Sequence, residues 1–239
     1  MTGRDTAADT APHTGPDAES GTGPDFRIDG AGPGRTTVLL AHWAGAAMDT
    51  PFMTAVADGL AARGLRVARF EFAYMASRRT GGSKRPPPKV DLLQEEFRAA
   101  IDALAPEGPL IIGGKSMGGR VASLIAGDLH AQGRVAGLLC LGYPFHPTGK
   151  PEKLRVAHLE DLAVPTLICQ GTRDPFGTRE EVAGYALSPQ IAVTWFKDGE
   201  HDLKPRKRLT GLTQQDHLAA ACAAIADWAA QLPEAGPGA

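Results

Sequence analysis

The chain has 239 residues, of which 43% are hydrophobic and 22% are charged, an ordinary balance for one globular domain with a sizeable core. Its formal net charge of −2 gives no reason to expect nucleic acid or an acidic membrane as a partner. The three cysteines, Cys140, Cys169 and Cys222, lie in apolar stretches without metal-ligand spacing, which predicts buried thiols and no metal site. Because no apolar run is long enough for a secretory signal or a membrane span, we expect a cytoplasmic protein.

Composition divides the chain into one domain and two tails. Residues 1–25 are rich in Thr, Gly, Pro, Asp and Ala and contain no apolar run, which predicts a disordered N-terminal tail. Residues 26–232 carry the apolar segments and form the predicted domain, and residues 233–239 form a short flexible tail.

Along the domain, short apolar runs alternate with longer segments of helical period. The predicted strands are, in chain order, 26–28 (an edge strand), Thr37–Ala41, 65–72, 110–113, 135–141, 166–169 and Ile191–Phe196. The predicted helices are 52–63, 91–104, 117–130 and 218–232. This order predicts an α/β fold with a mostly parallel sheet, helices on both faces and no large cap domain. In such sheets the chemistry lies just beyond the carboxyl ends of the strands.

The most informative motif follows the strand at 110–113. Gly114, Ser116 and Gly118 form a G-x-S-x-G pattern between that strand and a helix rich in small residues. A Ser at so sharp a turn is held in a strained backbone conformation, and glycines two residues away relieve the crowding. The turn raises the hydroxyl to the helix N-terminus, where free N–H groups can stabilise an oxyanion. We therefore predict that Ser116 is a nucleophile.

Gly114-Lys115-Ser116 also resembles the end of a phosphate-binding loop. That motif requires a Gly five residues before its Gly-Lys-Ser ending, and this chain has Pro109 there. It also requires a loop where this chain has a predicted strand. The sequence therefore excludes the ATPase interpretation.

An alkyl hydroxyl needs a general base to become a nucleophile, and the base needs an acid to orient it. In this fold the chain order is Ser, then Asp or Glu, then His. Asp174 lies in the loop after the strand at 166–169, and His201 lies in the loop after Ile191–Phe196. The sequence therefore predicts Asp174 as the acid and His201 as the base. The predicted oxyanion donors are the N–H groups of Met117 and Ala44, with Trp43 as the next candidate.

Six segments carry a resemblance to a known family: 41–53, 70–75, 113–120, 141–151, 170–176 and 199–203. On these residues the chain resembles the α/β-hydrolases that include testis-expressed protein 30-like hydrolases and the hydrolase-like domain of a non-specific-lethal chromatin-complex subunit. The resemblance implies a capless esterase-like fold and a triad of Ser116, Asp174 and His201. Those proteins usually have Gly where this chain has Trp43, so we expect the indole to narrow the pocket or alter the oxyanion hole.

Together these features predict a serine hydrolase that acts on an ester, thioester or related acyl compound without a cofactor. The candidate substrate-binding residues are Trp43, Lys115, His146, Arg85 and Arg206. Arg85 and Arg206 belong to two basic clusters, which are either ordinary solvated loops or a cationic rim that attracts an anionic substrate. Two alternatives stay open, namely an acyltransferase or lyase with the same Ser–His pair, and a non-catalytic scaffold. The sequence does not give the substrate or the oligomeric state.

Overall fold

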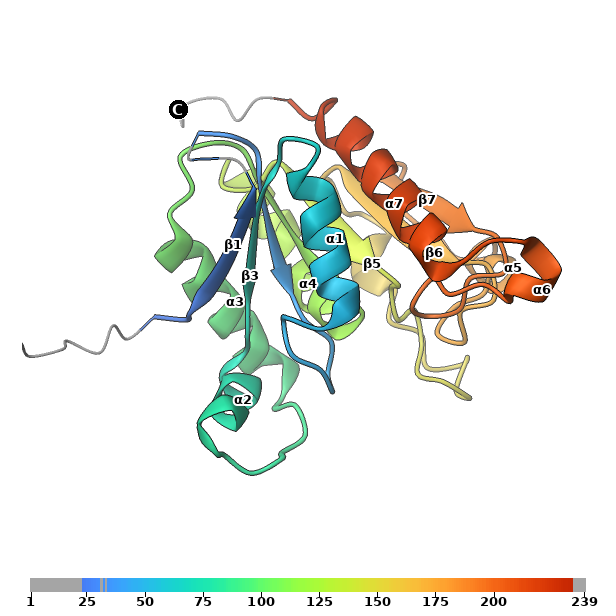
Figure 1. Cartoon of the computed structure of the whole chain (residues 1–239), viewed down its shortest axis with the longest axis horizontal. Helices are drawn as coiled ribbons and strands as arrows, with labels where there is room; N and C mark the ends of the chain where they lie inside the picture. Colours follow the sequence, from blue (N-terminus) through green and yellow to red (C-terminus); the bar gives the residue numbers. More distant parts are fainter. Residues whose placement is uncertain (1–22, 31, 33, 234–239) are drawn as a thin grey trace, which may run out of the picture.

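The computed structural model describes residues 23–30, 32 and 34–233. Seven strands form one sheet in the order β1-β3-β2-β4-β5-β6-β7, in which β1 is antiparallel to β3 and every other pair is parallel (Figure 1). The strands are β1 Phe26–Gly30, β2 Thr37–Ala41, β3 Arg66–Phe70, β4 Leu110–Lys115, β5 Gly137–Leu141, β6 Thr166–Gly171 and β7 Ile191–Phe196. The predicted mostly parallel sheet, with its edge strand, is confirmed.

Helices cover both faces of the sheet. Helices α1 (Pro51–Ala61) and α7 (Gln214–Ala229) pack on one face, and α3 (Val90–Leu104) and α4 (Met117–Ala131) pack on the other. The remaining helical segments are short, namely α2 Ala73–Ala76, η1 Ser77–Thr80, η2 Ala157–Leu159, α5 Arg179–Val182 and α6 Lys207–Thr210. No large cap is present among the described residues.

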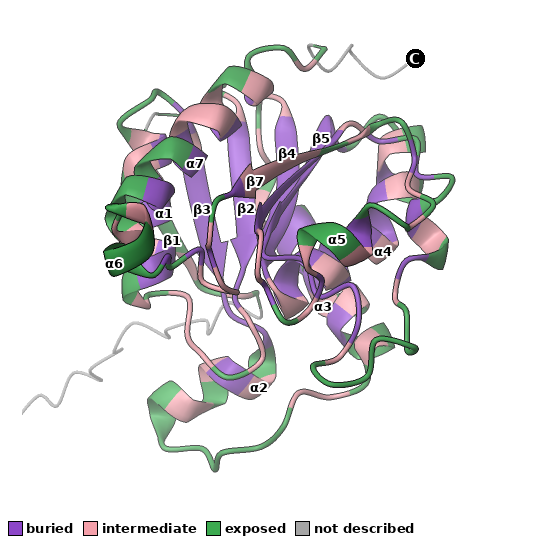
Figure 2. Ribbon diagram, turned by 90° about the vertical axis from the view of Figure 1, so that its right-hand side faces the viewer, coloured by how far each residue is buried: buried purple, intermediate pink, exposed green. Residues whose placement is uncertain are grey.

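The core consists of two apolar layers, one on each face of the sheet. In β2, Val38 and Leu40 contact the layer under α1 and α7, whereas Leu39 and Ala41 contact the layer under α3 and α4. This explains why the β2 sequence does not alternate between apolar and polar residues, since both of its faces are buried. Figure 2 shows the central strands buried and the exposed residues on the outer sides of the helices and in the loops.

Several predicted boundaries differ from the structure, and two of the differences have a clear local cause. The strand predicted at 65–72 ends at Phe70, because Phe72 is already the N-cap of α2. The last helix begins at Gln214 and not at 218, because Thr213 and Asp216 form a capping box at its start. The predicted tails lie mostly outside the described residues. Within the described part of the chain, no helix combines the length and the apolar character that a membrane span requires.

Candidate active site

Ser116 occupies a sharp turn between β4 and α4. Its backbone angles are φ 52° and ψ −112°, which places a residue with a side chain in a region that glycine favours. A Cβ on Gly114 would lie 2.3 Å from the carbonyl oxygen of Ala41, and a Cβ on Gly118 would lie 2.4 Å from the same atom. The two glycines therefore let the turn pack directly against the end of β2, as the motif predicts.

We expect Gly118→Ala to lower the free energy of unfolding by about 1–3 kcal/mol, because the added methyl group overlaps backbone atoms that cannot move aside. Gly127→Ala is the matched control on the same helix. There the added Cβ would lie 3.6 Å from Leu162, an ordinary contact. The free energy of unfolding of this variant should rise by about 0.4–1 kcal/mol. Urea unfolding measures both values. Equal stabilities for the two variants would contradict the close packing at the elbow.

Three side chains from three loops form one chain of hydrogen bonds. His201 Nε2 lies 2.8 Å from Ser116 Oγ, and His201 Nδ1 lies 2.8 Å from Asp174 Oδ2. Because a carboxylate accepts hydrogen bonds, the proton belongs on Nδ1, and Nε2 is free to accept the Ser116 hydroxyl proton. Asp174 is fully buried, whereas His201 is partly exposed. The structure thus brings together Ser116, Asp174 and His201, which follow β4, β6 and β7.

Gln170 holds Asp174 in place, and sequence reasoning missed it. Its Nε2 donates to Asp174 Oδ2 at 3.0 Å, and its Oε1 accepts from the N–H of Tyr143 at 2.7 Å. The N–H of Phe176 donates to the other oxygen, Asp174 Oδ1, at 2.9 Å. The Phe176 ring also lies against His201, with centroids 4.3 Å apart. A buried polar residue at the end of β6 was the available sequence signal, but nothing in the sequence gave its partners.

His42 fixes the loop after β2, which sequence reasoning assigned to the oxyanion hole. The N–H of Phe72 donates to His42 Nε2 at 3.2 Å, so Nδ1 carries the proton and donates to the carbonyl of Trp43 at 2.7 Å. Burial lowers the pKa of His42, which favours this neutral form. The Trp43 carbonyl and the Ala44 N–H belong to one trans peptide and point in opposite directions. His42 therefore sets the direction of the Ala44 N–H.

Trp43 packs towards α1. Its ring lies edge-on to Phe52 with centroids 6.3 Å apart, and the Nζ of Lys115 lies 5.7 Å from the centre of the indole. The indole is partly buried in the layer under α1 and α7. The indole of Trp43 therefore covers the ammonium group of Lys115. This contact was not predicted from the sequence.

Two predicted substrate-binding residues are buried and bonded within the protein. Lys115 is fully buried, and its Nζ donates to the backbone carbonyl of His201 at 2.9 Å. His146 is also buried, and its Nδ1 contacts the carbonyl of Pro147 at 3.0 Å while its Nε2 lies 3.5 Å from Glu181. The strand end and the loop turn both side chains into the domain, and their role towards a substrate stays a prediction.

One arginine of the predicted cationic rim, Arg206, forms an ion pair with Asp198 of the same chain. Arg206 Nε lies 2.9 Å from Asp198 Oδ1, and this arginine lowers the pKa of Asp198 to about 2. Arg85 is exposed in the segment after η1, which projects beyond the carboxyl edge of the sheet (Figure 1), and its Nε contacts Ser83. Neither arginine forms a hydrogen bond to Ser116, Asp174 or His201. The role of both arginines towards a substrate stays a prediction, and the ion pair with Asp198 partly neutralises the charge of Arg206.

A second Ser–His pair lies further along α4. Ser123 Oγ lies 2.8 Å from His158 Nε2 and 3.1 Å from the hydroxyl of Tyr143. Ser123 is 2% exposed, and burial lowers the pKa of His158 to about 4. Within the described ranges, no carboxylate bonds to His158. This pair therefore bridges α4 and the segment after β5 without the orienting acid that activation requires.

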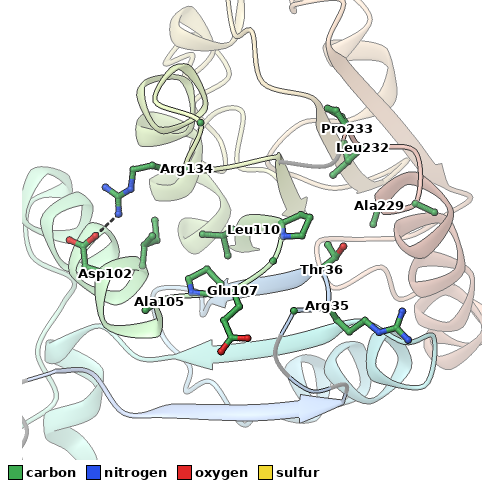
Figure 3. A pocket seen from close by; sticks show the side chains of 17 residues that line it. Arg35, Thr36, Asp102, Ala105, Glu107, Leu110, Arg134, Ala229, Leu232 and Pro233 are labelled. Carbon is green, nitrogen blue, oxygen red and sulfur yellow. Dashed lines mark hydrogen bonds and ion pairs between the residues drawn. The ribbon is translucent and has the colours of Figure 1, made fainter. Parts of the chain in front are cut away.

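Other features lie away from this site. A cavity of about 870 Å³ is present at the opposite edge of the sheet, where the strands begin, and its lining includes Thr36, Leu110 and the ion pair between Arg134 and Asp102 (Figure 3). None of Ser116, Asp174 and His201 lines it. Among residues 23–30, 32 and 34–233, no group of three His, Cys, Asp or Glu side chains is placed to hold a metal ion.

The sequence profile of one family, described as an alpha/beta hydrolase domain, matches residues 34–230. The chain belongs to this alpha/beta hydrolase family. Its elbow after β4, acid after β6 and histidine after β7 follow the order in which this fold places a nucleophile, an acid and a base.

Solved structures of similar fold cover nearly the whole domain. An alpha-beta serine hydrolase homologue from Coxiella burnetii is 20% identical with a TM-score of 0.62, over 84% of this chain and 89% of that one. A serine hydrolase without lid from Xanthomonas campestris is 21% identical with a TM-score of 0.63, over 88% and 90%. Dienelactone hydrolase from Anabaena variabilis is 18% identical with a TM-score of 0.65, over 87% and 91%. At these identities the likeness is one of fold.

Proposed function

We propose that this alpha/beta hydrolase-family protein is a serine hydrolase that cleaves a small ester or thioester through an acyl-enzyme on Ser116. The observation that carries the proposal is the chain of two 2.8 Å hydrogen bonds from Asp174 through His201 to Ser116. Ser116 Oγ attacks the acyl carbonyl as its proton passes to His201 Nε2, and that proton then leaves with the alcohol or thiol. A water molecule, deprotonated by His201, hydrolyses the acyl-enzyme and regenerates Ser116.

The proposed oxyanion hole consists of the N–H groups of Met117 and Ala44. Met117 is the first residue of α4, so its N–H has no acceptor within the helix. The direction of the Ala44 N–H is set by the hydrogen bond from His42 to Trp43, and the Ala44 carbonyl accepts from the hydroxyl of Tyr74 at 2.9 Å. Two oriented N–H groups beside the nucleophile would stabilise the tetrahedral intermediate.

Several finer features of the proposal rest on the sequence. The closer resemblance to testis-expressed protein 30-like hydrolases and the cytoplasmic location stay predictions from the residues. The substrate is proposed to be a small acyl compound, and its negative charge was inferred from basic clusters of which one is now partly neutralised by Asp198.

Labelling with a fluorophosphonate probe tests the proposal. The probe should modify Ser116 of the full-length protein, located by peptide mass spectrometry, and Ser116→Ala should abolish labelling. Ser123→Ala is the matched control, because Ser123 also contacts a histidine on the same helix but lacks an acid behind it. A folded wild-type protein that is not labelled, or that is labelled at Ser123, would contradict the proposal and favour a non-catalytic scaffold.

A further inference from the structure

Lys115 is a fully buried lysine, which is rare unless the charge is paired. Its Nζ donates to the carbonyl oxygen of His201 at 2.9 Å and lies 3.2 Å from Asp202 Oδ1. Burial lowers the pKa of Lys115, and the Asp202 carboxylate opposes this effect. The ammonium group is therefore held against the backbone of the loop that carries His201.

The same ammonium also contacts aromatic rings from the loop after β2 and from α1. Its Nζ lies 5.7 Å from the ring centre of Trp43 and 5.5 Å from that of Phe52. Both distances are in the range of cation–π attraction, which is stronger when the charge is removed from water. Three segments that are far apart in the sequence thus meet at one Nζ atom: residues 43–52, the end of β4 and residues 201–202.

We propose that Lys115 is a positioning residue that fixes His201 relative to Ser116, with Trp43 and Asp202 completing its binding site. This inference rests on the proposed function of Ser116 and His201. Lys115 precedes Ser116 in the chain, so a single peptide bond joins the nucleophile to the residue that holds the base loop. The ammonium therefore links the two backbones directly, independently of the Ser116–His201 hydrogen bond. We call the Lys115 Nζ and its contacts with His201, Asp202 and Trp43 the lysine clamp.

Loss of the clamp should affect the reaction more than binding. Without the ammonium, the carbonyl of His201 loses its buried donor and the loop shifts to find another. A displacement of about 1 Å in such a site costs about 100-fold in rate. The clamp binds the backbone carbonyl of His201 and not the imidazole nitrogen that faces Ser116, so KM for a small ester should change little.

Lys115→Met tests the clamp, because methionine is similar in length and suits an apolar site. We expect its second-order rate of fluorophosphonate labelling, and kcat for p-nitrophenyl acetate, to fall by about 100-fold with KM unchanged. The downfield proton resonance of His201 Nδ1–H should shift or broaden, because the hydrogen bond to Asp174 loosens. Asp202→Ala, which alters a partly exposed side chain, should show the same changes to a smaller extent even if Lys115→Met does not fold.

Two controls separate positioning from general stability. Lys204→Met makes the same chemical change at an exposed position near His201. Cys222→Ala removes a buried sulfur that lies between α7 and Val56 of α1 and contacts none of the clamp residues. Both should keep the wild-type labelling rate and resonance, although Cys222→Ala melts earlier. Wild-type rates and an unchanged resonance in folded Lys115→Met or Asp202→Ala would overturn the inference. The inference would also be overturned if Cys222→Ala lost labelling rate and the His201 resonance in proportion to its lower melting temperature, because the same losses would then follow from reduced stability alone. A wild-type protein that shows the downfield His201 Nδ1–H resonance but is not labelled would instead count against the proposed function. The resonance reports the position of His201 without requiring any reaction at Ser116.

Discussion

Replacing Ser116 with alanine is expected to lower kcat for p-nitrophenyl acetate by on the order of 10⁶-fold, because nucleophile and base act as one unit. His201→Ala should cause a similar loss, and the double variant should be no slower than either single one. Both variants should fold, since Ser116 keeps a Cβ as alanine and His201 is partly exposed. Initial rates and thermal melts measure the two effects separately.

The control for this comparison is Ser123→Ala, which changes the other histidine-bonded serine of α4 and should keep wild-type turnover. Activity of Ser116→Ala within tenfold of the wild type would show that another group is the nucleophile. Additive losses in the double variant would show that Ser116 and His201 act separately, contrary to their 2.8 Å hydrogen bond.

Asp174→Asn is expected to lower kcat by on the order of 10⁴-fold, because an amide no longer fixes the His201 tautomer. The substitution also disturbs a fully satisfied carboxylate. Its oxygens accept from His201, Gln170 and the N–H of Phe176, so an amide NH₂ group must face a donor on one side. We therefore expect a loss of about 1–3 kcal/mol in the free energy of unfolding as well.

Kinetics and urea unfolding of the same preparation separate the two effects of Asp174→Asn. Asp198→Asn is a matched control, because it removes one negative charge from the segment before His201 without touching the imidazole. A folded Asp174→Asn protein with turnover within tenfold of the wild type would contradict the assignment of Asp174 as the orienting acid.

The sequence predicted the meeting point of Ser116, Asp174 and His201 because each residue directly follows a buried strand. Parallel strands end at one edge, so their order along the chain was enough to bring the three side chains together. The central strands were predictable because they are short, fully buried apolar runs, such as TVLLA in β2 and GLLCL in β5. By contrast, α2, α5 and α6 contain four residues each, too few for a helical period to show in the sequence.

The contacts behind the triad could not be predicted from the sequence. Lys115 was predicted to bind the substrate, but the direction of its side chain depends on which face of β4 it occupies and on a carbonyl group 86 residues away. His42 and Gln170 are similar cases. Their partners, the N–H groups of Phe72 and Tyr143, belong to other strands' loops, and only the folded chain brings these atoms within hydrogen-bond distance.

Gln170 also determines where the chain can be lengthened. Its side chain bonds to both backbone groups of Tyr143, so this residue of β6 holds the start of the excursion between β5 and β6. The outer part of that excursion, residues 148–154, is exposed. Because each doubling of a loop's length costs only about 0.6 kcal/mol in closure entropy, this stretch can accept an inserted segment while Asp174 keeps its surroundings. The same position therefore offers an engineer a place to graft a lid over a fold whose described residues have none.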